Sequence, residues 1–315
     1  MSDSEGIIYD SKRIVDLRGP KNDLDLNRPY DWIVEKEMTS KGRVEDTGII
    51  FLTNKECSFK CLMCDLWKNT TDRSTPVRAI PEQISWALEK MPAARHLKLY
   101  NSGSFFDARA IPESDDKAIA DLIQGFDSVT VECHPNLVGD RLIRFNEMLR
   151  PELEVALGLE TAHPGVLEKL NKQMTLDDFR KAVEFLTSHG IRTRAFILLR
   201  PPYMSESEGI LWAKKSLDFA FECGVSCCTI IPVRAGNGAM EALMKAGDFS
   251  LPSIRSLEEV LTYGLELKNG RVFADLWDLE LFSDCTNCFE ARRGRLSRMN
   301  SEQSVSDQIH CVCGS

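Results

Sequence analysis

The chain alternates between short apolar runs and longer segments in which apolar residues recur at helical spacing. Apolar, β-branched runs predict six strands, at 48–53, 96–100, 128–132, 153–158, 192–199 and 226–232. Helical periodicity predicts helices at 81–91, 114–125, 138–149, 175–190, 205–223 and 253–268. Strand–helix units repeated in this way imply a parallel sheet. The sequence therefore predicts an α/β fold.

This alternation covers only the middle of the chain. Residues 1–45 are polar and are expected to form an N-terminal arm, and the core is expected over 46–270. The alternation stops after about residue 270, and 271–315 is expected to be a small C-terminal metal-binding extension that carries cysteines. With 315 residues, the chain is long enough to bury a full-sized core.

Composition narrows the class of protein. The net charge of −9 argues against a surface coated for nucleic-acid binding, although a local basic patch stays compatible with it. Seven of the eleven cysteines fall into two tight clusters, which is typical of metal sites in a reducing compartment. No run of 18 apolar residues and no signal peptide is visible. We expect a cytoplasmic protein that has no membrane partner.

The first cluster consists of Cys57, Cys61 and Cys64, spaced C-x3-C-x2-C. A [4Fe–4S] cluster in an electron carrier takes four thiolates, so three leave one iron open to a small molecule. The cysteines follow the strand at 48–53 and so lie at its carboxyl end, where parallel barrels place their chemistry. The alternatives are a zinc knuckle and three unrelated buried thiols.

Small polar residues follow the second strand. Gly103 lies among Asn101, Ser102 and Ser104, and a glycine in this setting lets the backbone approach a ligand closely. The alternative is an ordinary turn.

Charged residues end the next strands. Glu132 and Glu160 close the third and fourth strands, where a carboxylate can accept hydrogen bonds from a ribose or an ammonium group or can form a salt bridge. Arg200 closes the fifth and could clamp a carboxylate or phosphate, or pair with either glutamate. His134 is expected to be structural. No residue is assigned a catalytic role.

The second cluster lies near the C-terminus. Cys285 and Cys288 form a C-x2-C pair, and Cys311 and Cys313 form a C-x-C pair. Together they suit a closed four-thiolate zinc site. An auxiliary iron–sulfur cluster and cysteines without a metal are the alternatives, and His310 could replace one thiolate.

Four arginines within seven residues lie between these pairs. A basic patch of this kind could contact the phosphates of an RNA, whereas a solvated helix face would explain it without a function. The residues are Arg292, Arg293, Arg295 and Arg298.

A strand followed by a C-x3-C-x2-C loop resembles the radical S-adenosylmethionine (SAM) superfamily. Longer stretches resemble its Elp3-like branch and, within that branch, the archaeosine-biosynthesis radical SAM protein (RaSEA) group. The stretches are 96–107, 156–161, 170–172 and 198–202, and the similarity spans roughly residues 28–313.

Three departures separate the chain from the archaeal members of that group. Met63 stands where the superfamily often has an aromatic residue beside adenine, and Arg200 stands where archaeal relatives tend to carry lysine. The sequence of residues 65–71 resembles that of a bacterial offshoot of the group more than that of the archaeal enzyme.

This resemblance implies an open, TIM-like partial (β/α)6 barrel. It also implies that Cys57, Cys61 and Cys64 hold a [4Fe–4S] cluster whose open iron chelates SAM. The reduced cluster of the superfamily cleaves SAM to a 5′-deoxyadenosyl radical, with electrons from a reductant such as ferredoxin or flavodoxin.

The residues expected to bind SAM come from the cysteine loop and the strand ends. They are Met63, Asn101, Ser102, Gly103, Ser104, Glu132, Glu160 and Arg200.

Three functions remain open. RaSEA proteins cleave a C–N bond in a lysine-bearing deazaguanine base of tRNA, so the resemblance implies modification of a base in tRNA or another RNA. Radical chemistry on a small metabolite or peptide is the enzymatic alternative and fits the acidic surface better. A non-catalytic iron–sulfur or zinc module would leave the strand-end glutamates and the glycine loop unexplained.

Overall fold

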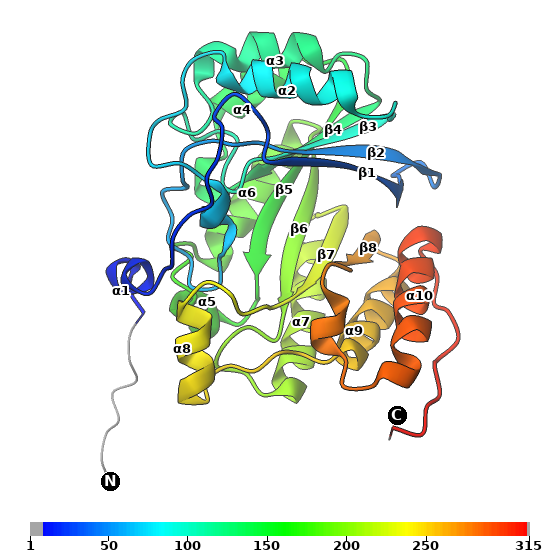
Figure 1. Ribbon diagram of the computed structural model, residues 1–315. Helices are drawn as coiled ribbons and strands as arrows, with labels where there is room; N and C mark the ends of the chain where they lie inside the picture. The colour runs from blue at the N-terminus through cyan, green and yellow to red at the C-terminus, as the bar shows by residue number, and fades with distance from the viewer. Residues whose placement is uncertain (1–8, 314–315) are drawn as a thin grey trace.

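The structure, a computed structural model, describes residues 9–313. Its centre is one eight-stranded sheet whose strands lie side by side in sequence order (Figure 1). The strands are β1 (Asp31–Met38), β2 (Val44–Phe51), β3 (His96–Tyr100), β4 (Ser128–Cys133), β5 (Glu152–Glu160), β6 (Arg192–Leu199), β7 (Cys227–Pro232) and β8 (Arg271–Ala274). Only β1 and β2 are antiparallel, and the sheet curls into a half-barrel. The predicted partial barrel of six parallel strands, β2 to β7, is confirmed.

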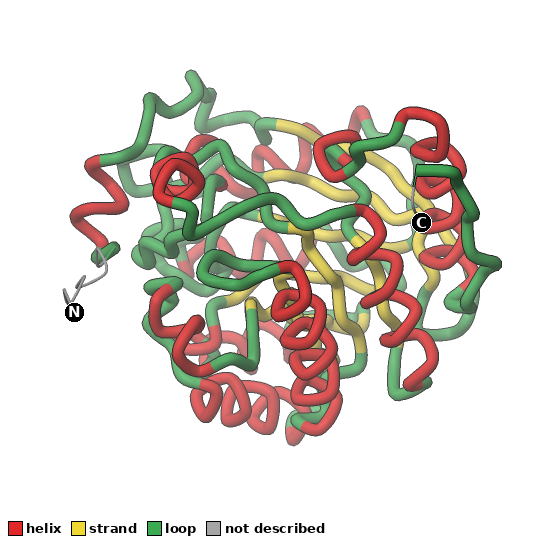
Figure 2. Tube along the Cα trace, turned by 90° about the horizontal axis from the view of Figure 1, so that it is seen from below, coloured by secondary structure: helices red, strands yellow, loops and turns green. Residues whose placement is uncertain are grey.

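Helices lie on the outer side of this curled sheet (Figure 2). The six predicted helices are present as α2 (Ala79–Lys90), α3 (Asp116–Leu122), α4 (Asp140–Glu147), α6 (Leu176–Ser188), α7 (Glu206–Glu222) and α9 (Ile254–Leu267). The periodicity did not predict α1 (Ser11–Asp16), α5 (Pro164–Lys169), α8 (Ala239–Ala246) and α10 (Thr286–Glu302). Short 3-10 helices are η1 (Leu66–Asn69), η2 (Glu113–Asp115), η3 (Pro135–Leu137) and η4 (Leu279–Phe282). No helix in residues 9–313 is both long enough and apolar enough to cross a membrane.

The two outer strands differ from the sequence prediction. The expectation that the alternation ends near residue 270 is wrong, because β8 follows α9 and pairs in parallel with β7. β1 lies within residues 1–45, which were expected to form the N-terminal arm. Its glutamates make this segment polar, so the sequence did not predict a strand there. The division into an arm, a core and an extension stays a prediction, and residues 1–8 of the arm and 314–315 lie outside the described residues.

Alternate residues of each strand face the helices or the barrel lumen. On β3, Leu97 and Leu99 are fully buried beneath the helices, whereas Lys98 and Tyr100 face the lumen. Burying one such leucine side chain contributes about 1.5–3 kcal/mol. The apolar layer between sheet and helices is thus the core, and the lumen is left for polar and aromatic groups.

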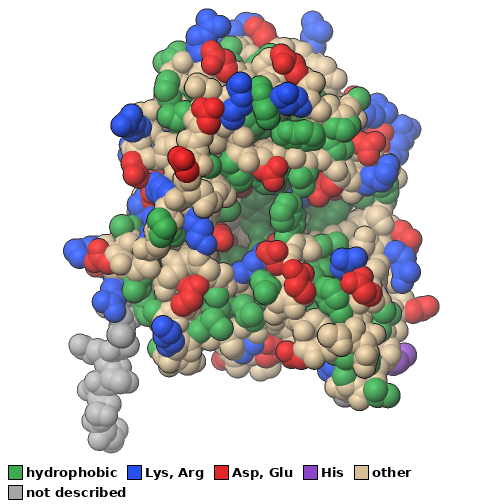
Figure 3. Space-filling model, in the orientation of Figure 1, with side chains coloured by type: hydrophobic (Ala, Val, Ile, Leu, Met, Phe, Trp, Pro, Cys, Tyr) green, Lys and Arg blue, Asp and Glu red, His purple; other side chains and the backbone are tan. Residues whose placement is uncertain are grey.

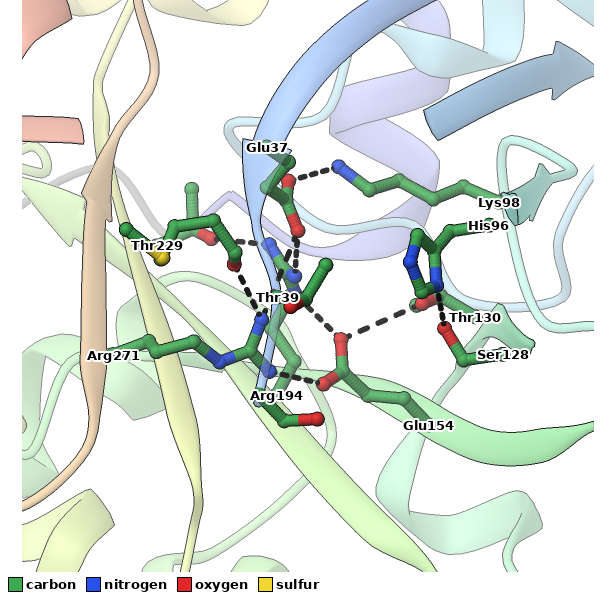
Figure 4. Close-up of polar contacts among 12 residues, drawn as sticks. Glu37, Thr39, His96, Lys98, Ser128, Thr130, Glu154, Arg194, Thr229 and Arg271 are labelled. Carbon is green, nitrogen blue, oxygen red and sulfur yellow. Dashed lines mark hydrogen bonds and ion pairs between the residues drawn. The ribbon is translucent and has the colours of Figure 1, made fainter. Parts of the chain in front are cut away.

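Ion pairs close the amino-terminal end of the lumen (Figure 4). Glu37 of β1 pairs with Lys98, and its other oxygen lies 2.6 Å from Arg194 of β6. Glu154 of β5 lies 2.8 Å from both Arg194 and Arg271. These pairs tie β1 across the lumen to β5, β6 and β8. The ion pairs fill the amino-terminal end of the lumen, which serves stability in parallel barrels. The carboxyl-terminal end is left for chemistry.

Candidate functional site

The three-cysteine loop lies between β2 and η1 at the carboxyl edge of the sheet. Its backbone is fixed by side chains and backbone groups from distant parts of the chain. The Leu62 N–H donates to the Leu170 carbonyl at 2.9 Å, and Asn171 Nδ2 donates to the Lys60 carbonyl at 2.7 Å. Asn237 Nδ2 donates to the Leu62 and Cys64 carbonyls at 2.7 and 3.1 Å. These hydrogen bonds fix the backbone of the loop at the barrel mouth.

An aromatic stack supports the same loop from one side. Phe59 lies flat on His134, with ring centroids 3.6 Å apart and an interplanar angle of 6°. His134 Nε2 contacts the Lys172 carbonyl at 3.0 Å. Burial and the nearby Lys172 charge lower the pKa of His134 to about 3, so its ring is neutral at pH 7. These contacts give His134 the structural role expected of it.

The glycine loop packs directly against the cysteine loop. A Cβ atom on Gly103 would lie 3.2 Å from Cys57 Cβ, so glycine permits the close approach. Asn101 is fully buried, yet its Oδ1 and Nδ2 atoms have no hydrogen-bond partner within the protein. A buried amide without partners is unfavourable, and a bound ligand can satisfy it. Asn101 therefore fits a cofactor that carries polar groups.

The two serines of this loop have partners. Ser102 Oγ lies 3.2 Å from the Tyr30 hydroxyl. Ser104 Oγ accepts the His134 N–H at 3.3 Å and contacts Cys133 Sγ at 3.5 Å. Ser104 thus ties the loop to β4, and its predicted role in SAM binding stays a prediction.

Glu132 contacts the glycine loop, and its predicted role in SAM binding stays a prediction. Its Oε2 atom accepts the Asn101 N–H at 2.9 Å, so its carboxylate holds the glycine loop rather than facing the mouth unpaired. Burial raises the pKa of Glu132 to about 7, although the N–H groups of Asn101, Ser102 and Gly103 oppose the shift. Glu132 positions the loop that carries Asn101.

Glu160 forms the salt bridge considered as its alternative role. Its carboxylate lies 2.5 Å from Lys172 Nζ, and both side chains are buried. A Cβ atom on Gly158 would lie 2.3 Å from both charged groups, so this glycine makes room for the pair. Sequence reasoning missed Lys172 as a site residue, although its segment was among the stretches that carried the family resemblance.

Lys172 also acts on the cysteines. Burial raises the pKa of the Cys57 thiol and raises that of Cys61 to about 11, and the Lys172 charge opposes both shifts. Thiols in such surroundings hold their protons until a metal displaces them. A cation beside them favours the metal-bound thiolates.

Arg200 has partners next to α7. Its Nη1 atom pairs with Glu206 at the start of α7 and donates to the Leu251 carbonyl at 2.7 Å. Its guanidinium anchors the start of α7, and its predicted role in SAM binding stays a prediction. Met63 is partly buried against the apolar cluster that contains Val233 and Met240.

The structure corrects the predicted RNA contact of the arginine patch. Arg292 and Arg295 of α10 are only 4% and 3% exposed, and both pair with the buried Glu258 of α9. The i and i+3 spacing places both on the face that packs against the barrel. Arg293 and Arg298 are exposed. Only these two remain candidates for phosphate contacts.

The four cysteines of the tail come together. Their Sγ atoms all lie within 4.8 Å of one another, although 22 residues separate the C-x2-C and C-x-C pairs. His310 is exposed and is not part of this group. The tail thus presents a second potential metal site apart from the barrel mouth.

The fold of this chain is similar to that of solved radical SAM enzymes. No protein-family model matches the chain. The solved structures that it resembles include Elp3 from Methanocaldococcus infernus, truncated at its N-terminus (TM-score 0.51, 17% identity, 70% of this chain and 58% of that chain). Streptococcus suis SuiB, solved with its precursor peptide SuiA, is similar too (TM-score 0.51, 14% identity, 70% and 47%). Both are radical SAM enzymes, and the chain has their fold.

In sequence, the chain is similar to archaeosine synthase subunit beta. The protein of Thermococcus kodakarensis is 27% identical over 226 residues, which cover 68% of this chain and 69% of that protein. The protein of Methanosarcina acetivorans is 26% identical over 214 residues, 64% and 60% of the two chains. An uncharacterised protein of Methanocaldococcus jannaschii is 24% identical over 253 residues. The predicted resemblance to the radical SAM superfamily and to RaSEA proteins is confirmed.

Proposed function

We propose that this protein is a radical SAM enzyme that modifies a base in tRNA or another RNA. The observation that carries the proposal is the pairing of two loops at the barrel mouth. Cys57, Cys61 and Cys64 lie on one loop, and the other presses Gly103 against Cys57 while leaving the buried Asn101 amide without a partner.

These residues fit a [4Fe–4S] cluster and SAM. The three cysteines would hold the cluster and leave one iron open. Asn101 offers both a donor and an acceptor, and the Glu160–Lys172 pair offers one charge of each sign to a zwitterionic amino acid moiety. When bound, the cluster and SAM would supply the radical chemistry, while the protein orients them and excludes water.

The lumen beside this site supports a planar substrate. In Figure 3 a hollow opens at the centre of this face, with hydrophobic side chains at its floor. Phe51 of β2, Tyr100 of β3 and Phe196 of β6 are partly exposed, and Tyr100 lies 6.3 Å from each of the other two, measured between ring centroids. Trp277, just after β8, lies 6.4 Å from Phe51 and so reaches across the opening. Aromatic walls of this kind stack nucleobases.

Relatives favour RNA as the source of that base. Archaeosine synthase subunit beta is a tRNA-modification protein in the group that the sequence resembles. The exposed Arg293 and Arg298 could add phosphate contacts. The proposal that the chain is a bacterial offshoot of this group remains a prediction.

The enzymatic alternative is a small metabolite or a peptide. The net charge of −9 and the burial of two of the four arginines favour it, because both weaken the attraction for phosphates. A non-catalytic module does not explain why Asn101 is buried without a partner beside the cysteines.

The substrate class is tested by comparing RNA nucleosides and small metabolites by mass spectrometry. The strains compared carry the intact gene, a deletion, or Cys61→Ala. A nucleoside that changes in both altered strains supports the proposal. If only a metabolite or peptide changes, the substrate is not RNA.

The aromatic wall is tested by Trp277→Ala. Trp277 is 53% exposed, so the fold should tolerate the change, whereas stacking on one ring contributes about 1–3 kcal/mol, or about tenfold or more in KM. Leu281→Ala, at a nearby residue that is 52% exposed, is the matched control and should leave KM unchanged. Equal KM values in both variants would remove Trp277 from the substrate site.

A further inference from the structure

The tail cysteines converge with the geometry of a single bound ion. Cys285 Sγ lies 3.9 Å from Cys311 Sγ, and Cys288 Sγ lies 3.9 Å from Cys313 Sγ. Four thiolates at about 2.3 Å from one zinc ion lie about 3.8 Å apart at the corners of a tetrahedron. An iron–sulfur cluster spreads its thiolates over several irons, which places them further apart. The spacing therefore favours one ion over the auxiliary cluster.

Arginines surround these sulfurs. Arg292 Nε points at Cys288 Sγ at 3.4 Å, and Arg255 Nη2 points at Cys313 Sγ at 3.1 Å. Arg292 also pairs with Glu258, which lies 3.3 Å from Arg295. A zinc ion bound by four thiolates carries two negative charges, so the guanidinium groups of Arg292 and Arg255 stabilise that complex more than they stabilise four neutral thiols.

The same arginines hold the segment that brings the second cysteine pair back. Arg295 donates to the Ser306 and Asp307 carbonyls at 3.0 and 2.8 Å, and Arg292 donates to the Ile309 carbonyl at 3.3 Å. Residues 303–313 contain no helix or strand. Side-chain contacts and the four sulfurs therefore fix this segment.

The site also secures the edge of the barrel. Asn300 of α10 exchanges two hydrogen bonds with the backbone of Ala274, at 2.9 and 2.8 Å. Gln303 does the same with Val272, at 2.8 and 2.9 Å. These amides pair with β8 as a further strand would, which protects the sheet edge. The cysteines at the start of α10 thus anchor the helix that covers β8.

We propose that Cys285, Cys288, Cys311 and Cys313 bind one zinc ion in a closed tetrahedral site. Arg292 and Arg255 are positioning residues that offset the charge of the bound thiolates. The ion holds α10 and the returning tail against the barrel. This proposal is independent of the function proposed for the barrel, because none of these residues lies in the three-cysteine loop.

The metal is identified by elemental analysis and zinc X-ray absorption of the full chain, purified anaerobically. We expect about one zinc per chain with four sulfur neighbours at about 2.3 Å, both in the natural protein and in the Cys57→Ala, Cys61→Ala, Cys64→Ala variant. Cys288→Ser should lose the zinc, and Val312→Ala, a change at a fully exposed residue of the same tail, should keep it. Iron instead of zinc in the triple variant, or no metal at all, would overturn the proposal.

The arginine role is tested by a matched pair on one helix. Arg292→Gln removes the buried contact to Cys288, and Arg293→Gln removes an exposed neighbour. Competition with a chelator should show zinc affinity about 10–100-fold lower in Arg292→Gln and unchanged in Arg293→Gln. Arg292→Lys keeps the charge and should recover part of the loss. Equal affinities in all four proteins would overturn the role of Arg292.

Discussion

The two cysteine groups of this protein are built for opposite purposes. The loop group has three cysteines beside the glycine loop and a buried asparagine amide that lacks a partner. The tail group has four cysteines whose sulfurs lie within 4.8 Å of one another, with arginines directed at two of them. We propose that the first arrangement leaves room for a ligand and that the second closes around one ion. The two kinds of site differ in the number of cysteines and in whether a buried polar group nearby lacks a hydrogen-bond partner.

The charged side chains around the two cysteine groups also differ. Near the loop, Lys172 pairs with Glu160, so the barrel mouth keeps one charge of each sign for a ligand. Near the tail, Arg292 and Arg295 share Glu258, and the Arg292 guanidinium also faces Cys288 Sγ. The comparison predicts that changes in the tail affect stability and that changes at the mouth affect ligand binding.

The largest effect is expected from Glu258→Gln. The change leaves Arg292 and Arg295 buried without their carboxylate, and breaking a buried ion pair in this way costs about 3–5 kcal/mol. Chemical denaturation should show that loss of unfolding free energy. Glu259→Gln, at an exposed neighbour on α9, should lower it by less than about 1 kcal/mol. Equal losses would mean that the buried arginine pairs do not stabilise the tail.

A smaller effect is expected in the pH dependence of stability. The pKa of Glu132 rises from 4.5 to about 7 on folding, so its contribution is complete below pH 4.5 and is lost as the pH rises through about 7. Replacing it by glutamine removes this titration. The difference in unfolding free energy between the natural protein and Glu132→Gln should change by up to about 3 kcal/mol across that range.

Lys172 is the charged side chain that opposes the raised pKa of Glu132, and the Glu132 charge in turn helps to raise the pKa values of Tyr30 and Tyr100. Burial raises the pKa of Tyr30 to about 12 and that of Tyr100 further, and the Glu160 charge keeps the pKa of the buried Lys172 high. None of them titrates between pH 4.5 and pH 7. Parallel stability curves for the two proteins would contradict the raised pKa of Glu132.

Asn101→Ala tests ligand binding at the barrel mouth. Because the buried amide makes no hydrogen bond within the protein, the unfolding free energy of the ligand-free protein should stay the same or rise. SAM affinity, measured by equilibrium dialysis on reconstituted protein, should fall about tenfold, since a hydrogen bond to a charged group contributes about 1.5–3 kcal/mol. Unchanged SAM affinity would show that Asn101 does not contact the ligand.

The smallest effect is expected from the exposed arginines. If Arg293 and Arg298 contact phosphates, changing both to glutamine should reduce the salt dependence of RNA binding by up to about 1.5 in log–log slope. Gel-shift titration with total tRNA at several salt concentrations measures this slope. An identical slope in the double variant would leave α10 without a role in RNA binding.

The core and the two cysteine groups could be predicted because each leaves a strong local pattern. The parallel strands are apolar runs, and the cysteine spacings are distinctive. β1 and β8 were missed because Glu37 and Arg271 face an ion-paired lumen end, which makes both strands read as polar. Lumen-facing charges are visible only once the strands have been placed.

Partners of single charged residues were harder to predict. Arg200 binds Glu206, and Arg292 binds Glu258, 34 residues earlier in the chain. Sequence alone showed a basic run but not which of its members the fold buries. Lys172 was overlooked for the same reason. Its pairing with Glu160 depends on the space that Gly158 leaves, and no sequence motif indicates that pairing.

The most direct test of the account is the formation of 5′-deoxyadenosine from SAM by anaerobically reconstituted, dithionite-reduced protein. We predict product from the natural protein, from the tail variant Cys288→Ser and from Cys223→Ala, a control at a buried cysteine outside both groups. No product is expected from Cys57→Ala, Cys61→Ala or Cys64→Ala. Product from any of these three loop variants, or its absence from the natural protein with a fully assembled cluster, would contradict the account.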